Sequence, residues 1–376
     1  MTGEGPESRD NQQVREYLLC LMVAAAVTYL ATPMVRAVAL RAGAYTHIRA
    51  RDVHTKITPR WGGLGMYIGL LAAFAIAGKL PMMRAVFEDL GTVFGLLGAT
   101  TLLVAIGLID DRFDLDAPTK IAGQAMAAGI LAWRGIGFIW LPLGNATVLD
   151  PLTSTLLTLL VVLVCINAVN FVDGLDGLAS GIVLVGAAAS FVYSYLLSVQ
   201  YGFERATLST LISAILTGVC LGFLPHNVNP ARIFMGDTGA MMLGLLLASC
   251  TVTLTGQVDP NALEGTSRAS TVLPILLPLA ALAIPLADFG LAVVRRTARG
   301  RSPFSPDREH MHHRLLDLGH GPRAAASIMH VGAAILAFST VALAFIPWLY
   351  VAIVCVICLA LLAAVIFRAP EVRHAR

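Results

Sequence analysis

The chain has 376 residues, of which 57% are hydrophobic and 13% are charged, and its formal net charge is +3. Soluble domains carry roughly 25% charged residues, so this composition excludes a soluble protein and predicts an integral membrane protein with many spans. The small net charge, without clusters of basic and aromatic residues, excludes a nucleic-acid-binding surface. We therefore expect an all-α polytopic protein whose surroundings are a lipid bilayer.

Eleven apolar stretches are long enough for membrane-spanning helices, which need about 20 mostly apolar residues. These stretches lie near 17–40, 61–79, 91–109, 119–135, 153–169, 178–198, 206–224, 239–256, 271–294, 326–346 and 348–367. No internal repeat or soluble domain interrupts them, so we expect residues 1–376 to form one transmembrane domain. Gly, Pro and Asn punctuate residues 135–151, which are compatible with a small hairpin between the fourth and fifth spans.

The basic residues predict the orientation, because cytoplasmic loops carry an excess of Lys and Arg. Of the 26 Lys and Arg residues, 19 lie in the C-terminal tail and in the loops that follow odd-numbered spans. These loops and the tail, residues 368–376, are therefore predicted to be cytoplasmic. The polar N-terminus, residues 1–15, is predicted to lie outside a plasma (inner) membrane that the chain crosses many times.

The first polar cluster of the cytoplasmic loops, residues 49–63, contains His54 and Lys56 and ends in Gly62-Gly63. A positively charged loop before a helix start explains these charges equally well. A role for His54 and Lys56 in a site therefore depends on the other clusters.

The second cluster is the pair Asp110-Asp111, which ends the uncharged third span, together with Lys120 at the start of the fourth. Adjacent carboxylates repel, and their cost rises at a membrane boundary, so such a pair usually serves a site. Adjacent helical side chains point about 100° apart. One carboxylate can therefore face a metal ion while the other faces a second ligand or Lys120.

The third cluster separates two uncharged spans and reads Asn167-Ala-Val-Asn170-Phe-Val-Asp173-Gly-Leu-Asp176-Gly177. Asn167, Asn170 and Asp173 are three residues apart and share one face if the helix continues through them. The glycines after Asp173 break the helix and let the backbone approach a ligand. A polar turn between two spans is the structural alternative.

The fourth cluster, Phe234-Met-Gly-Asp237-Thr-Gly, precedes the eighth span. The Asp237 carboxylate could cap the N-terminus of that span. It could instead bind Mg²⁺, which takes one or two protein carboxylates together with substrate phosphates.

The fifth cluster lies within residues 303–321, and its candidate site residues are His310, His312, His313 and Arg314. No cysteine accompanies them, and the other clusters offer hard oxygen ligands, which favours phosphate binding over a structural zinc site. Acidic groups for a magnesium ion and cations for phosphate, all on one membrane face, predict phosphoryl transfer to a lipid phosphate.

Taken in order from His54 to Gly321, the five clusters resemble the polyprenyl-phosphate N-acetylhexosamine-1-phosphate transferases. The motifs that carry the resemblance are His-Thr-Lys with Pro-Arg-Trp-Gly-Gly, Asp-Asp with Lys, Asn-Ala-Val-Asn-Phe-Val-Asp-Gly-Leu-Asp-Gly, Phe-Met-Gly-Asp-Thr-Gly and His-Met-His-His-Arg. The resemblance implies transfer of a sugar 1-phosphate from a UDP-N-acetylhexosamine to a polyprenyl phosphate, with release of UMP. It also implies Mg²⁺ as the cofactor, with Mn²⁺ as the alternative, and is compatible with a homodimer.

The resemblance implies roles for individual residues by their positions in the motifs. The implied catalytic residues are Asp110, Asp111, Lys120 and Asp173, and the implied metal ligands are Asn170 and Asp237. Residues 174–176 and Phe234 match positions at the uridine, and residues 310–314 match the loop near the diphosphate and sugar. The implied substrate-binding residues are His54, Lys56, Asn167, Gly174, Leu175, Asp176, Phe234, His310, His312, His313 and Arg314.

Three questions about the activity stay open: the donor substrate, the route of the reaction and the class of protein. The last loop resembles the branch that uses UDP-GlcNAc to initiate cell-envelope polysaccharides such as O-antigen, teichoic acid or the arabinogalactan linker. The alternative substrate is that of the phospho-MurNAc-pentapeptide transferases of peptidoglycan synthesis. A direct attack by the lipid phosphate, oriented or deprotonated by Asp110 or Asp111, competes with a two-step route through an aspartyl phosphate. A transporter or flippase is the alternative of a different class, but its polar groups should follow the bilayer depth.

Overall fold

The structure, a computed structural model, describes residues 6–45, 58–141, 147–201, 207–257, 269–283 and 311–368, with isolated positions between 286 and 298. The described secondary structure is almost entirely helical, and β1 (Trp140–Leu141) and β2 (Thr147–Val148) are its only paired strands. These two strands are antiparallel, with Trp140 opposite Val148. They confirm the hairpin expected within residues 135–151.

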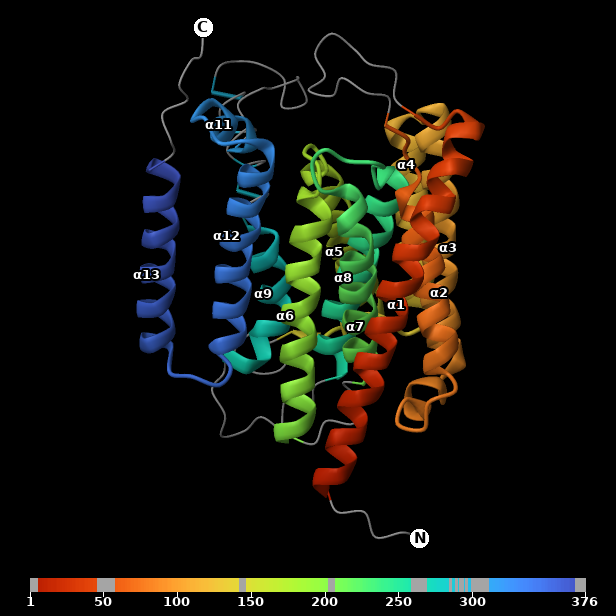
Figure 1. The fold of residues 1–376 in the computed structure, drawn as a ribbon. Coiled ribbons are helices and arrows are strands. Elements are labelled where there is room, and N and C mark those ends of the chain that lie inside the picture. Colours follow the sequence, from red (N-terminus) through yellow and green to blue (C-terminus); the bar gives the residue numbers. More distant parts are fainter. Residues whose placement is uncertain are drawn as a thin grey trace, which may run out of the picture.

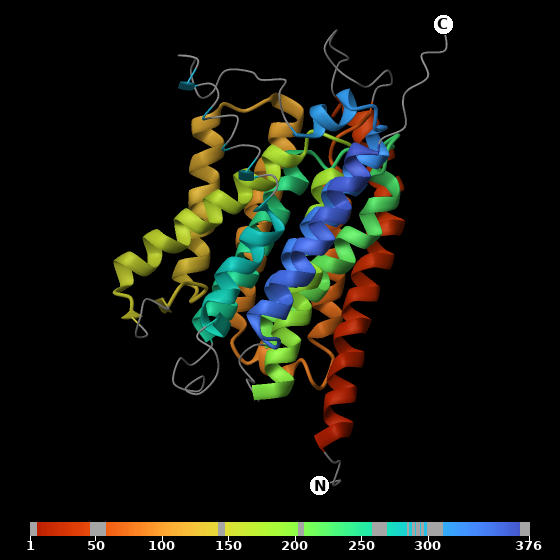
Figure 2. The ribbon, with the colours of Figure 1, turned by 90° about the vertical axis from the view of Figure 1, so that its left-hand side faces the viewer.

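The helices form one bundle in which successive elements run in alternating directions (Figure 1). Before the hairpin they are α1 (Pro6–Ala42), α2 (Gly62–Ala77), the 3-10 helix η1 (Arg84–Phe87), α3 (Leu90–Phe113) and α4 (Ala117–Trp133). After it follow α5 (Pro151–Val172), α6 (Leu178–Tyr201), α7 (Thr207–Asn227), α8 (Gly236–Gln257), α9 (Ala269–Ala281), α11 (Met311–Asp317), α12 (Pro322–Ala342) and α13 (Trp348–Phe367). The view from the side shows that α5 is inclined relative to its neighbours (Figure 2).

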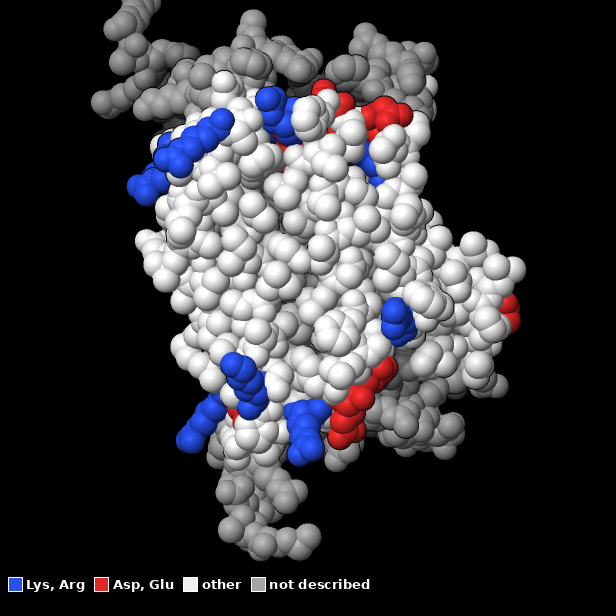
Figure 3. Space-filling view, turned by 90° about the vertical axis from the view of Figure 1, so that its right-hand side faces the viewer, with Lys and Arg blue, Asp and Glu red and all other residues white. Residues whose placement is uncertain are grey.

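Eight of the described helices are long and apolar enough to cross a membrane, and α2 is a shorter apolar helix of 16 residues. Apart from the seven-residue α11, the described α-helices number eleven, as the eleven apolar stretches predict. On the face shown in Figure 3, Lys, Arg, Asp and Glu gather toward the two ends of the bundle, and the band between them carries few charges. The chain is therefore a polytopic all-α membrane protein.

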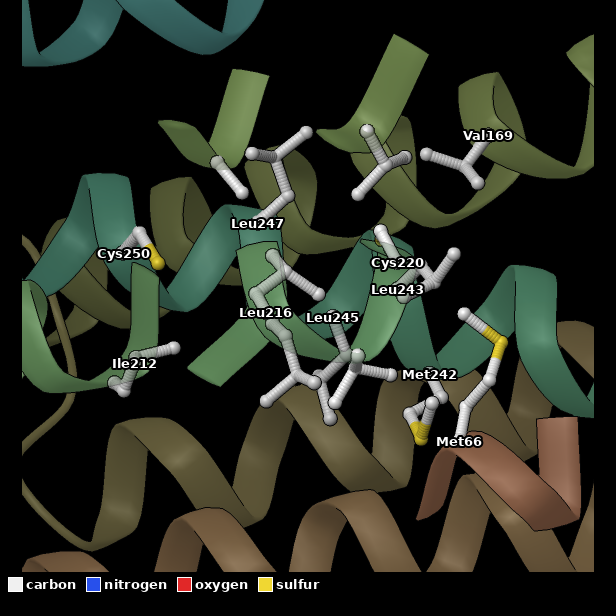
Figure 4. Packing of buried hydrophobic residues seen from close by; sticks show 14 of the residues in the cluster. Met66, Val169, Ile212, Leu216, Cys220, Met242, Leu243, Leu245, Leu247 and Cys250 are labelled. Carbon is white, nitrogen blue, oxygen red and sulfur yellow. The ribbon is translucent and has the colours of Figure 1, made fainter. Parts of the chain in front are cut away.

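Helix α8 lies at the centre of the bundle and is buried along its length. Figure 4 shows Leu243 and Leu245 of α8 among side chains from α2, α5 and α7, which include Met66, Val169 and Leu216. Two glycines allow neighbouring helices to approach the start of α8 closely. A Cβ atom on Gly63 would lie 2.2 Å from the Gly239 nitrogen, and one on Gly107 would lie 2.4 Å from the Thr238 Cα. Small residues at such crossings are typical of helix packing in membranes.

Candidate active site

The polar clusters meet at the end of the bundle where α3 and α5 finish and α4 and α8 begin (Figure 1). This convergence follows from the alternating directions of the helices, because every second loop lies on the same side. It brings together Asp110 of α3, Lys120 of α4 and Asp237 of α8. The Lys120 Nζ lies 2.7 Å from the Asp110 Oδ2 and 2.9 Å from the Asp237 Oδ2. One ammonium group therefore bridges two carboxylates that are 127 residues apart in the chain.

Asp110 is 4% exposed and has a second function in the turn between α3 and α4. Its Oδ1 accepts a hydrogen bond of 2.8 Å from the backbone N–H of Leu115. The turn itself requires Asp114 to adopt a positive φ of 55°. The Asp110 carboxylate thus fixes the start of α4 and the position of Lys120 on it.

Asp111 binds the first turn of α8. Its Oδ1 accepts a hydrogen bond of 2.9 Å from the backbone N–H of Asp237. Its Oδ2 accepts from the Thr238 backbone N–H at 3.2 Å and from the Thr238 hydroxyl at 2.6 Å. The helical spacing therefore gives the adjacent carboxylates of Asp110 and Asp111 different partners, as the sequence predicts.

Asp237 lies in the first turn of α8, which begins at Gly236. The side chain of Asp237 meets Lys120, and the cap of the first α8 N–H groups comes from Asp111 instead. The N-cap that the sequence allowed for Asp237 is therefore not what the structure shows. Gly236 has a positive φ of 68°, and a Cβ atom there would lie 2.3 Å from the Asp111 Oδ2. Only glycine fits between these two elements.

Asn170 and Asp173 lie at the end of α5, and both side chains are half-buried. The helix stops at Val172, so Asp173 caps it and does not continue its face. Burial raises the pKa of the Asp173 carboxyl to about 7, and the negative charges of Asp237 and Asp111 add to this rise. The positive charge of Arg60 opposes it. Asp173 therefore lies within electrostatic range of the carboxylates of α3 and α8.

Asn167 and Asp176, both expected to bind substrate, have partners within the protein. The Asn167 amide donates to the Gln124 Oε1 and to the Leu163 carbonyl, each at 2.8 Å, and so links α5 to α4. The buried Asp176 Oδ2 accepts from the Asn229 amide at 2.9 Å and from the Ala231 N–H at 3.0 Å. Asp176 thus joins the loop after α5 to the loop before α8.

Phe234, Gly174 and Leu175 lie on these same two loops. Phe234 is half-buried, Gly174 is exposed and Leu175 is buried. The Phe234 N–H donates to the Pro59 carbonyl at 2.9 Å, and its carbonyl accepts from the Gly62 N–H at 2.9 Å. The segment that leads into α2 is therefore held against the segment that leads into α8.

Six expected site residues belong to the first and last clusters. His54, Lys56 and His310 lie outside the described residues. His312 and His313 belong to α11, of which the structure describes only the backbone at these positions, and Arg314 is an exposed residue of the same helix. Helix α11 lies at the same end of the bundle as the site (Figure 1).

Sequence reasoning missed the contributions of Arg60 and Thr238. Arg60 interacts electrostatically with both Asp173 and Asp237, and within the described part of the chain it forms no ion pair. The sequence feature that could have identified Arg60 as a site residue is its place in the motif Pro-Arg-Trp-Gly-Gly. Thr238 supplies a hydroxyl and an N–H to Asp111. It follows Asp237 directly in the fourth motif, but nothing in the sequence indicates its partner.

The oxygen atoms of Asp110, Asp237 and Asn170 have the chemistry that Mg²⁺ prefers. The position between Asp110 and Asp237 already accommodates a positive charge, the Lys120 ammonium. Among the described residues, no group of three or more His, Cys, Asp or Glu side chains forms a complete metal cage. Magnesium typically keeps only one or two protein carboxylates and takes the rest of its ligands from phosphates and water. The residues present therefore fit a metal ion that arrives with a phosphate substrate.

Comparison with known proteins agrees with these motifs. Residues 93–255 match glycosyl transferase family 4. The chain is 42% identical over 337 residues to a decaprenyl-phosphate N-acetylglucosaminephosphotransferase of Mycolicibacterium smegmatis, a match that covers 88% of this chain and 83% of the relative. It is 43% identical over 330 residues to the protein of that name from Mycobacterium tuberculosis, with 86% and 82% covered.

A more distant relative is a probable undecaprenyl-phosphate N-acetylglucosaminyl 1-phosphate transferase of Bacillus subtilis. It is 27% identical over 336 residues, which are 89% of this chain and 86% of the relative. These matches confirm the resemblance that the five motifs carry. The chain belongs to glycosyl transferase family 4 and, within it, to the polyprenyl-phosphate N-acetylhexosamine-1-phosphate transferases.

Proposed function

We propose that the chain transfers GlcNAc 1-phosphate from UDP-GlcNAc to a polyprenyl phosphate, forming polyprenyl-diphospho-GlcNAc and releasing UMP. The names of the relatives support this donor sugar and this lipid acceptor. The observation that carries the proposal is the Lys120 ammonium held between Asp110 and Asp237 at one end of a membrane bundle. A lipid phosphate reaches such a site with its head group while its tail stays in the bilayer.

The reaction is a displacement at the β-phosphorus of UDP-GlcNAc. An oxygen of the lipid phosphate forms the new bond, and the bond from the β-phosphorus to the oxygen that bridges the two phosphates breaks. UMP leaves with that oxygen and both electrons of the bond. We propose the direct attack as the route. Isolation of a phosphorylated Asp110 or Asp111 after a single turnover without lipid would contradict it and favour the two-step route.

The site residues are suited to positioning and to charge neutralisation, which dominate catalysis of phosphoryl transfer. We assign Asp110 to the orientation or deprotonation of the lipid phosphate, and Lys120 to the phosphate groups. Asn170 and Asp237 would hold Mg²⁺, which supplies positive charge to the diphosphate when it is bound. Arg60 is a second cation beside Asp173 and Asp237, and we assign it to the anionic donor.

We also propose that the site end of the bundle is cytoplasmic and that the chain lies in the plasma membrane. The excess of basic residues in the loops at this end supports the orientation. The beginning of α1 and the end of α13 lie at opposite ends of the bundle (Figure 1), which suits an external N-terminus and a cytoplasmic C-terminus.

Release of UMP by the full-length protein in detergent tests the proposal. UDP-GlcNAc, UDP-GalNAc and UDP-MurNAc-pentapeptide should be compared, each with and without polyprenyl phosphate and Mg²⁺. We expect UMP only when UDP-GlcNAc, lipid phosphate and Mg²⁺ are all present. Preference for UDP-MurNAc-pentapeptide would favour the peptidoglycan enzyme. Binding of UDP-GlcNAc without any UMP release would favour a transporter.

A further inference from the structure

Asp111 is 7% exposed, and its described hydrogen bonds all lead to one place. The carboxylate accepts three hydrogen bonds, two of them from the backbone N–H groups of Asp237 and Thr238 and the third from the Thr238 hydroxyl. The ammonium of Lys120 pairs with Asp110 and Asp237, and no ion pair links it to Asp111. Asp110 therefore pairs with Lys120 of α4, whereas Asp111 binds the first turn of α8.

The two backbone N–H groups that donate hydrogen bonds to Asp111 belong to the first turn of α8. Backbone donors in the first turn of a helix have no partner within that helix. A side chain of the helix itself usually supplies the cap. Here a carboxylate from α3 supplies it, and negative charge at a helix N-terminus is favourable. The close approach depends on Gly236, where a Cβ atom would meet the carboxylate, and on Gly107, where it would meet Thr238.

The cap fixes the backbone of Asp237, whose carboxylate is the candidate metal ligand. The Asp237 N–H is bound to Asp111 at 2.9 Å, and the Asp237 carboxylate lies 2.9 Å from Lys120. The backbone and the side chain of one residue are thus held from two different helices. A shift in the first turn of α8 would move the Asp237 oxygens relative to Asp110.

We propose that Asp111 is a positioning residue, which with Thr238 fixes the start of α8 and thereby aims the Asp237 carboxylate, while Asp110 is the member of the pair that touches the reacting groups. The inference rests on the proposed function, since it assigns Asp237 to the metal. It gives Thr238 a role that neither its position nor its chemistry would suggest. It also separates two adjacent aspartates that the motif presents as a unit.

Because Asp111 with Thr238 and Asp110 are assigned different roles, substitutions of Thr238 and of Asp110 should cause different defects. Thr238→Val removes one of the three hydrogen bonds without changing the shape of the side chain or any charge. It should weaken metal binding on the order of tenfold, the effect of losing about one hydrogen bond to a charged group. At saturating metal its turnover should return to near that of the unsubstituted protein. Asp110→Asn should lose turnover at every metal concentration.

The test is Mn²⁺ binding to the full-length protein in detergent, followed by electron paramagnetic resonance, with UDP-GlcNAc present as the source of phosphate ligands and without lipid phosphate, so that no turnover occurs. Thr100→Val is the matched control, because the Thr100 hydroxyl of α3 is likewise buried but donates to a carbonyl of its own helix, that of Leu96, at 2.7 Å. We expect weaker Mn²⁺ binding in Thr238→Val and Asp111→Asn and unchanged binding in Thr100→Val. Unchanged binding in Thr238→Val, or no Mn²⁺ binding by the unsubstituted protein, would overturn the proposal.

Hydrogen exchange of the peptide that contains Asp237 and Thr238 adds a readout that needs neither metal nor substrate. Asp111→Asn should accelerate exchange in this peptide, and Asp110→Asn should not. Equal exchange in both variants would overturn the proposal. If the first turn of α8 responds in this way but the unsubstituted protein transfers no GlcNAc 1-phosphate, the proposed function fails and the capping role of Asp111 stands.

Discussion

Helices α8 and α13 have similar lengths, 22 and 20 residues, and opposite places in the molecule. Helix α13 has no charged residue and is the more apolar of the two, yet Val351 is its only buried residue and it packs mainly against α12. Helix α8 carries Asp237 and several hydroxyl groups and is buried along its length. In a soluble protein the more apolar helix would occupy the core.

The difference shows what drives helix packing in this protein. Lipid tails are as apolar as leucine, so hydrophobicity alone does not draw a helix inward. Close packing and hydrogen bonds between helices do so, and α8 has both. Helix α8, whose polar groups would be unfavourable in lipid, is therefore the helix that the bundle surrounds. The candidate site forms at its first turn.

The largest expected effect is the loss of activity in Asp237→Ala. Removal of this carboxylate takes away the proposed metal ligand and a partner of Lys120, and we expect UMP release to fall by at least about 10³-fold. The fold should persist, because α8 keeps its buried apolar contacts. Size-exclusion elution and thermal unfolding of the variant check this point. UMP release at the normal rate would refute the assignment of the site to α8.

Leucine-to-alanine substitutions in the two helices test the comparison through stability. Leu245 of α8 is fully buried, whereas Leu361 of α13 is 63% exposed. Leu245→Ala should cost about 2–5 kcal/mol of unfolding free energy, because a cavity remains in the core. Leu361→Ala leaves no cavity and should cost far less. Chemical unfolding in mixed micelles measures both, and equal losses would show that the two helices are packed alike.

Two glycines of α3 provide a sharper pair. A Cβ atom on Gly107 would lie 2.4 Å from the Thr238 Cα, whereas one on Gly98 would meet nothing within 4 Å. Gly107→Ala should destabilise the protein by about 1–3 kcal/mol through overpacking and should lower transferase activity as α8 shifts. Gly98→Ala should be neutral or slightly stabilising, because alanine favours helix. Similar unfolding temperatures for the two variants would contradict the close α3–α8 contact.

The smallest expected effect concerns the hydroxyl groups within the spans. The Thr255 hydroxyl of α8 donates to the Thr251 carbonyl at 2.8 Å, and the Thr340 hydroxyl of α12 donates to the Leu336 carbonyl at 2.8 Å. Side-chain hydrogen bonds within membranes contribute about 0.6 kcal/mol on average. Thr255→Val and Thr340→Val should each change the unfolding free energy by about that amount or less. A much larger loss for Thr255→Val would mean that α8 depends on its hydroxyl groups more than on close packing.

Much of the fold could be predicted from the sequence, because spans and turns leave local signals. The expected spans 178–198 and 119–135 correspond to α6 (Leu178–Tyr201) and α4 (Ala117–Trp133). The expected span 17–40 is the apolar part of a longer helix, since α1 begins at Pro6 and includes polar residues. Hydropathy detects the part of a helix that lies in lipid, not the end that extends into water.

The order of helices from core to lipid could not be predicted, because apolar composition does not distinguish α8 from α13. The site was predictable in its outline, since topology alone places Asp110, Lys120 and Asp237 at one end. The partner of Asp111 was not, because it depends on a contact between helices that begins with Gly107 and Gly236. The contacts of Asn167 with Gln124 and of Asp176 with Asn229 likewise join distant parts of the chain, and the expected roles of Asn167 and Asp176 in substrate binding stay predictions.

The fate of the β-phosphate distinguishes transfer of a sugar phosphate from transfer of the sugar alone. The full-length protein would be given UDP-GlcNAc labelled with ³²P at the β-phosphate, together with polyprenyl phosphate and Mg²⁺. We expect the label to move into the lipid fraction in step with UMP release, and we expect Asp237→Asn to abolish both. Label that stays in a water-soluble nucleotide while the sugar moves to lipid would contradict the proposed transfer of GlcNAc 1-phosphate.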